Sequence, residues 1–262
     1  GGFGDWLLGQ DEVIIRDAIV TWQDEVRNAP ALKFTGVSAR MVNGGVTHQI
    51  GFIATPPADI AAPIDVRAEL RGASLLNMGE WTGSVYARMA SGNVAAWGAY
   101  LPIPVVVKTG MGGAQAWVDF EGMNITGSVA DVQLVDVSTK LKADLPPLQL
   151  ENLNGRLSYR ERASGFNFSG QNLDFTLANS KTNVPEADYF FQYSLASEKQ
   201  AASGELLASA LDMEAVRLVA DALPLDAAHR KRLDQFSPKG RAENIAIKWS
   251  GDLLAGYLHL LA

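Results

Sequence analysis

The sequence predicts a mainly β fold, an antiparallel meander interrupted by a few short helices. Three observations lead to this prediction. Apolar and polar residues alternate along many short segments, turn-forming residues separate those segments, and only three stretches carry apolar residues at helical spacing. At 262 residues and 47% hydrophobic content, the chain can bury a large core, and we therefore expect an ordered structure of one large or two small domains.

The clearest alternation lies in residues 64–71, where Ile, Val, Ala and Leu occupy the even positions and charged residues occupy the odd ones. One face of this strand is therefore apolar and the other charged. The same alternation predicts strands within residues 46–54, 114–120, 157–159, 166–168, 173–177, 189–195 and 245–249. Segments of about 8 to 11 residues recur between turn residues such as Asn43-Gly44-Gly45, Asn154-Gly155 and Ser164-Gly165, as in antiparallel meanders.

Three helices are predicted between the strands. The first covers residues 93–101 and is stopped by Pro102, the second opens at Asp212 and ends at Pro224, and the third runs from Asp226 to Phe236. Their apolar stripes favour a position over an end or an edge of a sheet. The order of strand, helix, Leu-Pro, glycine and Trp-bearing strand occurs twice, which suggests internal repeat units at residues 1–122 and 123–262 of one extended β-array.

Composition excludes several classes of protein. The formal charge of -7, with no concentrated basic face, argues against a nucleic-acid partner. The absence of cysteine rules out disulfides, thiolate metal sites and a cysteine nucleophile. No segment reaches the ~20 apolar residues that a membrane-spanning helix needs. Residues 253–262 resemble a strand that is cut short, and we expect the chain to be a fragment of a longer protein.

The residues that could carry chemistry do not form a recognisable set. His48, His229 and His259 are far apart in sequence, and none has a partner at metal-ligand spacing. His48 falls on the apolar face of a strand, where a hydrogen-bonded core histidine is the more frequent case. The pair Asp24-Glu25 is predicted to lie in a loop, and the glycines of residues 110–113 lack the lysine of a phosphate-binding loop. We therefore predict no catalytic residue, no metal site and no cofactor.

Several phrases of the sequence together resemble the YhdP family of AsmA-like bacterial envelope proteins. They are Arg16-Asp17-Ala18, residues 22–30, Phe52-Ile53-Ala54-Thr55-Pro56-Pro57, residues 62–67, Asp144-Leu145-Pro146-Pro147-Leu148, Leu153-Asn154-Gly155-Arg156-Leu157 and residues 240–245. The resemblance covers essentially the whole chain. It implies a long, twisted, curved antiparallel sheet that forms an open trough, as in bridge-like lipid transfer proteins; without it, a closed β-sandwich or barrel would be the better prediction.

The resemblance also implies a function. A protein of this family is expected in the periplasm, anchored to the inner membrane outside this fragment, with an apolar groove that carries phospholipid acyl chains between the inner and outer membranes. Alternation gives the residues that would line such a groove: Ile50, Phe52, Ile64, Val66, Leu70, Val118, Phe120, Leu157, Phe166, Phe168, Phe175, Phe191, Ile245 and Ile247. Its lining favours acyl chains because each buried CH₂ group gains ~0.8 kcal/mol.

Two other functions remain open at this point. The chain could be a structural or ligand-binding module of the envelope without lipid cargo, in which exposed tryptophans bind glycan. The six tryptophans are Trp6, Trp22, Trp81, Trp97, Trp117 and Trp249, and packing at strand ends is the simpler interpretation of each. A periplasmic hydrolase would need an Asp, Glu and His cluster that the fold brings together.

Overall fold

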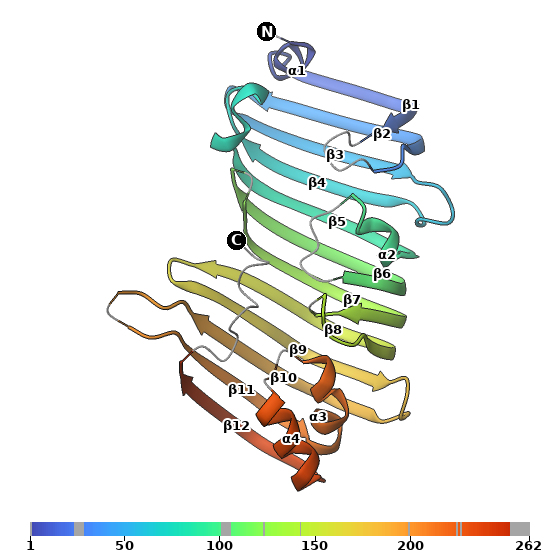
Figure 1. The fold of residues 1–262 in the computed structure, drawn as a ribbon. Coiled ribbons are helices and arrows are strands. Elements are labelled where there is room, and N and C mark those ends of the chain that lie inside the picture. Colours follow the sequence, from blue (N-terminus) through green and yellow to red (C-terminus); the bar gives the residue numbers. More distant parts are fainter. Residues whose placement is uncertain are drawn as a thin grey trace. The chain divides into compact units, whose positions relative to one another are not determined.

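The computed structural model describes residues 2–23, 29–100, 106–122, 124–141, 143–198, 200–223, 225 and 227–251. Within these residues, twelve strands form one antiparallel sheet in which each strand neighbours the next along the chain (Figure 1). The strands are β1 (Glu12–Trp22), β2 (Leu32–Gly44), β3 (Thr47–Thr55), β4 (Ile64–Arg71), β5 (Thr82–Asn93), β6 (Val106–Glu121), β7 (Asn124–Lys140), β8 (Leu148–Arg162), β9 (Gly165–Leu177), β10 (Asn183–Ser194), β11 (Ser203–Asp212) and β12 (Arg241–Ser250). Because β1 and β12 end the strand order without pairing, the sheet is not closed into a barrel, which confirms the predicted open antiparallel sheet.

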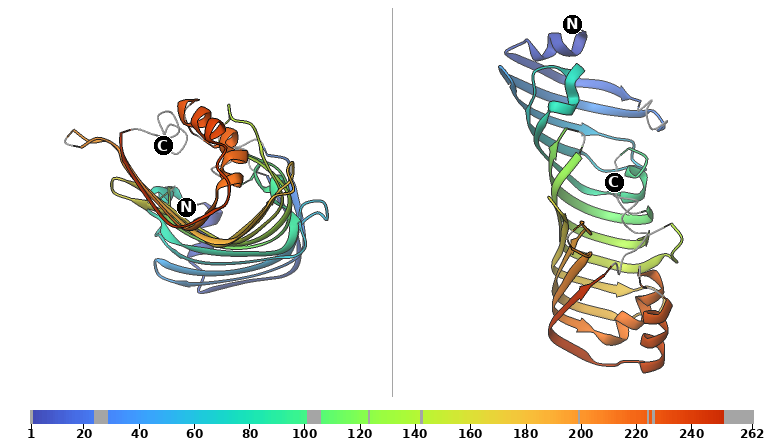
Figure 2. Two further views of the ribbon diagram at one scale, coloured as in Figure 1. Left: turned by 90° about the horizontal axis from the view of Figure 1, so that it is seen from below. Right: turned by 60° about the vertical axis from the view of Figure 1, so that its left-hand side comes forward.

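Short helices connect some of the strands. They are α1 (Phe3–Leu8), η1 (Leu75–Glu80), α2 (Val94–Trp97), α3 (Met213–Val219), η2 (Ala220–Ala222) and α4 (Ala227–Phe236). The predictions at Asp212 and before Phe236 are confirmed by α3, η2 and α4, whereas α1 and η1 were not predicted. The helix expected from residue 93 has a single turn, α2, because Gly98 follows it; Leu101 and Pro102 lie outside the described residues, as do Pro224 and Asp226. Figure 2 shows α3 and α4 together beside the ends of the neighbouring strands.

Contacts divide the chain into two compact units. Unit 1 consists of residues 1–100 and 112–131, and unit 2 consists of residues 101–111 and 132–262. Strands β6 and β7 therefore contribute residues to both units. The predicted repeat at residues 1–122 and 123–262 stays a prediction.

Several strands are longer than the sequence predicted, and in β8 a β-bulge explains the difference. β6 has 16 residues and β7 has 17. The pair Asn154-Gly155, predicted as a turn, lies inside β8, where Gly155 has a φ of 134° and the register with β9 shifts. That prediction is wrong because a glycine at positive φ can insert an extra residue into a strand and bend it, without reversing the chain.

Bulges in unit 2 follow one another from strand to strand. Asn172 in β9 has a φ of 49°, and the register of β10 shifts on both sides of Ala187. Side chains replace the missing ladder bonds there: the amide of Asn172 donates to the Asp188 carboxylate (2.9 Å), and the amide of Asp188 donates to Ser209 Oγ (2.8 Å). The strands of unit 2 bow along their length (Figure 2), as expected for bulges at neighbouring positions.

A cluster of buried residues lies in unit 1. It consists of Ala29, Leu32, Phe34, Val37, Ala54, Ala61, Ile64 and Tyr100. Most of these residues come from one end of β2, β3 and β4 and from the segments that follow β3 and α2. The described part of the chain contains no helix with the length and apolar character needed to cross a membrane.

Candidate functional site

The first candidate site is the apolar face of the unit-1 strands. Phe52 in β3 pairs with Ala39 in β2 and with Val66 in β4, and Val66 pairs in turn with Ala87 in β5. Residues that pair across antiparallel strands point to the same side of the sheet, so these side chains form one apolar row. The adjacent row on the same side consists of Met41, Ile50, Ala68 and Val85. We call these two rows the unit-1 apolar face.

One end of the unit-1 apolar face is covered by packing. Trp97 and Ile60 pack against the buried cluster that contains Ile64, and Phe52 lies edge-on to Phe34 with ring centroids 5.9 Å apart. The Tyr100 hydroxyl donates a hydrogen bond of 3.1 Å to the carbonyl of Pro30. The segments that follow β3 and β5 therefore form a dry cap over this end of the face.

The other end of the unit-1 apolar face holds a buried histidine. His48 is only 1% exposed, and its Nδ1 lies 2.6 Å from Asn43 Oδ1 while its Nε2 lies 3.0 Å from the carbonyl oxygen of Gly72. Asn43 Nδ2 donates to the carbonyls of Leu7 and Gln10, which ties the end of α1 to the same cluster. Both ring nitrogens of His48 have partners, which agrees with the predicted hydrogen-bonded core histidine and leaves neither nitrogen for a metal ion.

The apolar face of unit 2 is built in the same way but is lined by aromatic rings. Phe168 in β9 pairs with Tyr159 in β8 and with Phe191 in β10. Phe191 pairs with Leu206 in β11, which pairs with Ile247 in β12. The neighbouring row on this side contains Phe166, Tyr193 and Trp249, and Phe191 contacts the Trp249 ring at a centroid distance of 5.7 Å. We call these two rows the unit-2 apolar face.

Part of this second face is open to solvent. Phe168 is 41% exposed and Ile247 is 48% exposed, whereas Tyr193 in the neighbouring row is buried. The Nε1 atom of Trp249 is buried and has no hydrogen-bond partner within the described residues. An exposed phenylalanine and isoleucine on the same side of a sheet form an apolar surface that a closed core would cover.

Two tyrosines report the low polarity of this side of unit 2. Tyr189 pairs with Gly170 and Ala208. It lies two residues before Phe191 in β10 and therefore points to the same side of the sheet. Burial raises the pKa of Tyr189 above its ordinary value of 10.0, and it does the same for the pKa of Tyr159. Removal from water disfavours the charged phenolate, so both residues stay neutral at physiological pH.

The residues predicted to line a groove have the following positions. Ile50, Phe52, Ile64, Val66 and Leu70 point to the side of the unit-1 apolar face, with Ile64 inside its packed end. Leu157, Phe166, Phe168, Phe175, Phe191, Ile245 and Ile247 point to the side of the unit-2 apolar face. In β6, the ring of Trp117 contacts Tyr86 on one side of the sheet. Because side chains of a strand alternate, Val118 and Phe120 point to the other side. Their role as a lipid lining stays a prediction.

The residues considered for catalysis do not converge where the structure describes them. No group of three or more His, Cys, Asp or Glu side chains within the described ranges could hold a metal ion. Asp24, Glu25 and His259 lie outside those ranges, and His229 belongs to α4.

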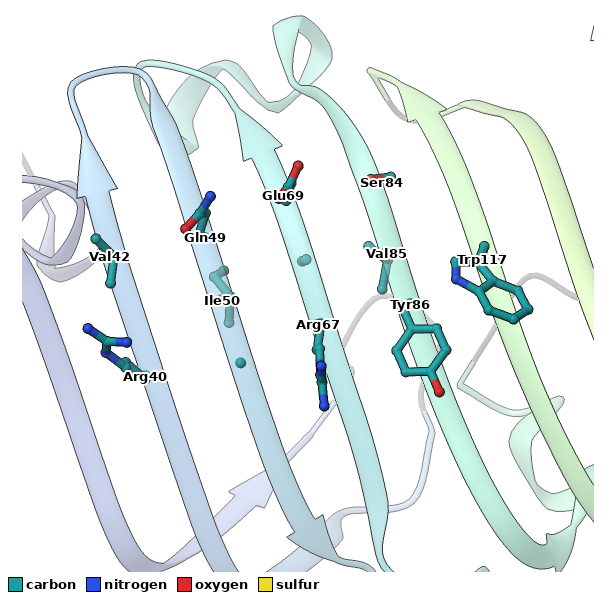
Figure 3. Close-up of a pocket in the computed structure, with 12 residues that line it drawn as sticks. Arg40, Val42, Gln49, Ile50, Arg67, Glu69, Ser84, Val85, Tyr86 and Trp117 are labelled. Atoms are coloured by element: carbon teal, nitrogen blue, oxygen red, sulfur yellow. The ribbon is translucent and has the colours of Figure 1, made fainter.

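A second candidate site lies on the polar face of unit 1, on the opposite side from the unit-1 apolar face. Here β2 to β6 enclose a hollow of about 390 Å³ (Figure 3). Its polar side chains are Arg40, Gln49, Arg67, Glu69 and Ser84, and its aromatic side chains are Tyr86 and Trp117. The rings of Tyr86 and Trp117 are 5.2 Å apart at an interplanar angle of 49°.

Both arginines of this hollow are ion-paired. Arg40 Nε lies 2.6 Å from Glu12 Oε1, and Arg67 Nη2 lies 3.0 Å from Asp65 Oδ2. The hydrogen bond to Asp65 raises the pKa of Arg67 above its ordinary value. A neighbouring carboxylate therefore balances the positive charge of each guanidinium group.

Sequence reasoning missed this hollow because it treated charged residues of alternating strands as a solvated face. The available signal was Gly51, a glycine within an otherwise regular strand, which the register places between Arg40 of β2 and Arg67 of β4. A glycine inside a strand often marks a place where a ligand or another backbone approaches closely. Of the tryptophans, Trp81 is buried as expected for packing, whereas Trp6 and Trp117 are exposed.

A comparison with known protein families finds a match for this chain. A family model described as "YhdP protein" matches residues 2–262. No curated protein and no solved structure matches the chain significantly.

Proposed function

The chain belongs to the YhdP family, and from this premise we propose that it is a non-enzymatic periplasmic segment of an AsmA-like envelope protein whose apolar sheet faces carry phospholipid acyl chains between the inner and outer membranes. Family membership supports the envelope role, and the proposal includes an anchor in the inner membrane outside these residues. Acyl chains are the partners proposed for the apolar faces.

The observation that carries the proposal is an apolar sheet face that other parts of the described chain leave partly open. Phe168 and Ile247 in unit 2 are 41% and 48% exposed, and on unit 1 Ile15, which pairs with Ala39 of the apolar face, is 40% exposed. In a β-sandwich a second sheet would cover such residues. An acyl chain laid across these rows would bury them, and its CH₂ groups would gain about 0.8 kcal/mol each.

The faces also have a direction that suits an elongated ligand. Apolar rows run from strand to strand, across β2 to β5 in unit 1 and across β8 to β12 in unit 2. Neighbouring strands are spaced by about 4.8 Å, so each row places an apolar side chain every few carbon atoms of an extended acyl chain.

Mass spectrometry of lipid that co-purifies with the chain tests this proposal. The chain should be produced in the periplasm and purified without detergent, together with Phe168→Asp and the control Asn167→Asp. Phe168 points to the unit-2 apolar face, and its neighbour Asn167 pairs with Gln192 on the opposite side. Because Phe168 is partly exposed, a carboxylate there can remain hydrated in the lipid-free protein, so the variant should fold.

The expected result is phospholipid in the parent and in Asn167→Asp, and a several-fold reduction in Phe168→Asp at an unchanged melting temperature. If the two folded variants retain equal amounts of phospholipid, the lipid does not bind at Phe168 on the unit-2 apolar face. A parent without phospholipid would overturn the proposal.

The proposal that no side chain performs chemistry has a separate test. His229→Ala and Asp24→Ala should leave lipid loading unchanged, and His48→Ala should act only by lowering stability. A stable variant that binds lipid normally but loses cellular function would argue for a catalytic role of the replaced residue.

A further inference from the structure

The hollow on the polar face of unit 1 has a glycine, Gly51, among the residues that line it. Register pairs Gly51 in β3 with Arg40 in β2 and with Arg67 in β4, and Arg67 pairs with Tyr86 in β5. Gly51 is therefore the one residue without a side chain in a row of four whose other members, Arg40, Arg67 and Tyr86, carry long ones. A Cβ atom added at Gly51 would meet no atom within 4 Å.

Two of the usual reasons for a glycine in a strand do not apply to Gly51. The pairing of β3 with both neighbours is regular from Thr47 to Ile53, so no bulge occurs at this position. No backbone or side chain approaches the position that a Cβ would occupy. Close approach of a ligand is a further reason for a glycine inside a strand, and it agrees with the open space at this position.

The walls of the hollow combine an aromatic surface with unused hydrogen-bonding groups. Trp117 is 39% exposed and leans on Tyr86 at one side of the hollow, as Figure 3 shows. Gln49 and Glu69 pair across β3 and β4. Across the described ranges, the side chains of Gln49, Glu69, Ser84, Tyr86 and Trp117 make no hydrogen bond with another protein group.

The charges in the hollow argue against an anionic ligand. Arg40 is paired with Glu12 and Arg67 is paired with Asp65, so a carboxylate already balances each positive charge and would repel an incoming phosphate or carboxylate. Glu69 adds a further negative charge to the lining. A neutral ligand with many hydroxyl groups has no such conflict, because hydroxyls can donate to the carboxylates and accept from the guanidinium groups without breaking the ion pairs.

A sugar ring meets these requirements. Its C–H groups present an apolar surface that can stack on an indole ring, while its hydroxyls spread outward in the plane of the ring toward planar amide, carboxylate and guanidinium groups. The volume of about 390 Å³ falls within the range of ~300–1,000 Å³ that is usual for small-ligand sites.

We propose that this hollow is a binding site for a neutral saccharide, with one sugar ring over Gly51 stacked on Trp117 and its hydroxyls hydrogen-bonded to Gln49, Glu69 and the two ion-paired arginines. The site is on the opposite side of the strands from the unit-1 apolar face. Saccharide binding and lipid carriage are therefore separate properties, and either can fail without the other.

Gly51→Val gives the sharpest test. The valine side chain would fill the hollow, and it suits a strand at a position where the backbone is not in the left-handed region. The Gly51→Val protein should therefore be at least as stable as the parent. Ser38→Val is the matched control, because Ser38 lies in β2 on the same polar face, pairs with Ile53 and does not line the hollow. Trp117→Ala is the second test variant, since it removes the aromatic surface.

The measurement is calorimetric titration of the 262-residue chain with neutral tetrasaccharides of glucose, N-acetylglucosamine, galactose and mannose, followed by NMR of the tryptophan indole N–H signals. We expect saturable binding of at least one of them, a shift of the Trp117 indole signal, and a loss of affinity of tenfold or more in Gly51→Val and Trp117→Ala but not in Ser38→Val. Inorganic phosphate is the anionic probe and should not compete.

Three outcomes would overturn the proposal: no saturable binding of any of the four tetrasaccharides, competition by phosphate at equal concentration, or undiminished binding by a folded Gly51→Val.

Discussion

The indole ring of Trp81 lies over the imidazole ring of His48, with ring centroids 5.3 Å apart and ring planes 19° from parallel. The Trp81 Nε1–H donates to the carbonyl of Ser74 (2.8 Å), which fixes the indole from the segment between β4 and β5. A Cβ at Gly72 would lie within 2.3 Å of this indole, so only glycine leaves room for it. These contacts anchor one end of the unit-1 apolar face, as the cluster around Tyr100 anchors the other.

His48→Leu should lower the free energy of unfolding. Leucine keeps the apolar contact with Trp81 but removes the imidazole N–H, so at least one of the two nearby acceptors, Asn43 Oδ1 and the Gly72 carbonyl, loses its donor, and a buried unsatisfied polar group costs about 1–3 kcal/mol. Urea denaturation measures the change. Thr47→Ala, one residue away on the other side of β3, is the control and should change stability by less than about 0.5 kcal/mol. An equally small change for His48→Leu would contradict the anchoring role.

Asp188→Ala should destabilise unit 2 by about 1 kcal/mol, because the Asn172 amide loses its acceptor at the bulge. Asp188→Asn keeps an acceptor oxygen and should recover most of the loss. Hydrogen exchange of the Asn172 amide gives a local measurement: it should be faster in Asp188→Ala than in Asp188→Asn. Equal exchange rates would show that the carboxylate is not needed at the bulge.

Stability should fall as the pH rises above about 10. The folded-state pKa values of Tyr159 and Tyr189 are raised above 10.0, so the unfolded chain loses these protons first. The stabilisation that comes from the raised pKa values of these two tyrosines is fully present below pH 10. It is lost as the pH rises through their folded-state pKa values. The free energy of unfolding, measured between pH 9 and pH 11, should decline less steeply with pH in the double variant Tyr159→Phe/Tyr189→Phe than in the parent. Identical slopes would mean that the two phenols are as well hydrated in the fold as in the unfolded chain.

Trp97→Asp should destabilise unit 1 by about 2–4 kcal/mol, because Trp97 packs against the buried cluster and a carboxylate there has no partner. Ala96→Asp is the neighbouring control and should matter less. Trp97→Phe should be close to neutral, since the indole Nε1 is buried without a hydrogen-bond partner and its removal relieves that cost. Thermal unfolding of the three variants checks this expected order of stabilities.

Val66→Asp and Arg67→Asp compare the two faces of β4. Val66 packs against the buried cluster beneath the apolar face, so a carboxylate there should lower stability by about 2–4 kcal/mol and also reduce lipid loading. Arg67→Asp faces the hollow and should leave lipid loading unchanged. Melting temperature and co-purifying phospholipid are the two measurements, and lipid loss in Arg67→Asp alone would mean that the lipid binds the polar face.

Much of the fold could be predicted because period-2 alternation is a local signal. Residues 64–71 form β4 with the bounds that alternation indicated, and β9, β10 and β12 contain the predicted segments. The signal failed at the bulges: Gly155 and Asn172 shift the alternation within a strand, so Asn154-Gly155 was predicted as a turn and β9 was predicted only as the separate segments 166–168 and 173–177. The strand β7, without a clean alternation of its own, was also not predicted.

Between the bulges, the amino-acid sequence is enough to predict which side chains share a face, because side chains of a regular strand alternate whatever the strand pairs with. It also determined the short helices at Asp212 and Phe236, whose start signals and apolar spacing are local. Only the tertiary structure decided that the sheet stays open, because closure depends on whether the first and last strands pair. It alone brought His48 to Gly72 and Trp81, and Gly51 between Arg40 and Arg67, since the register between strands sets which residues of distant segments become neighbours.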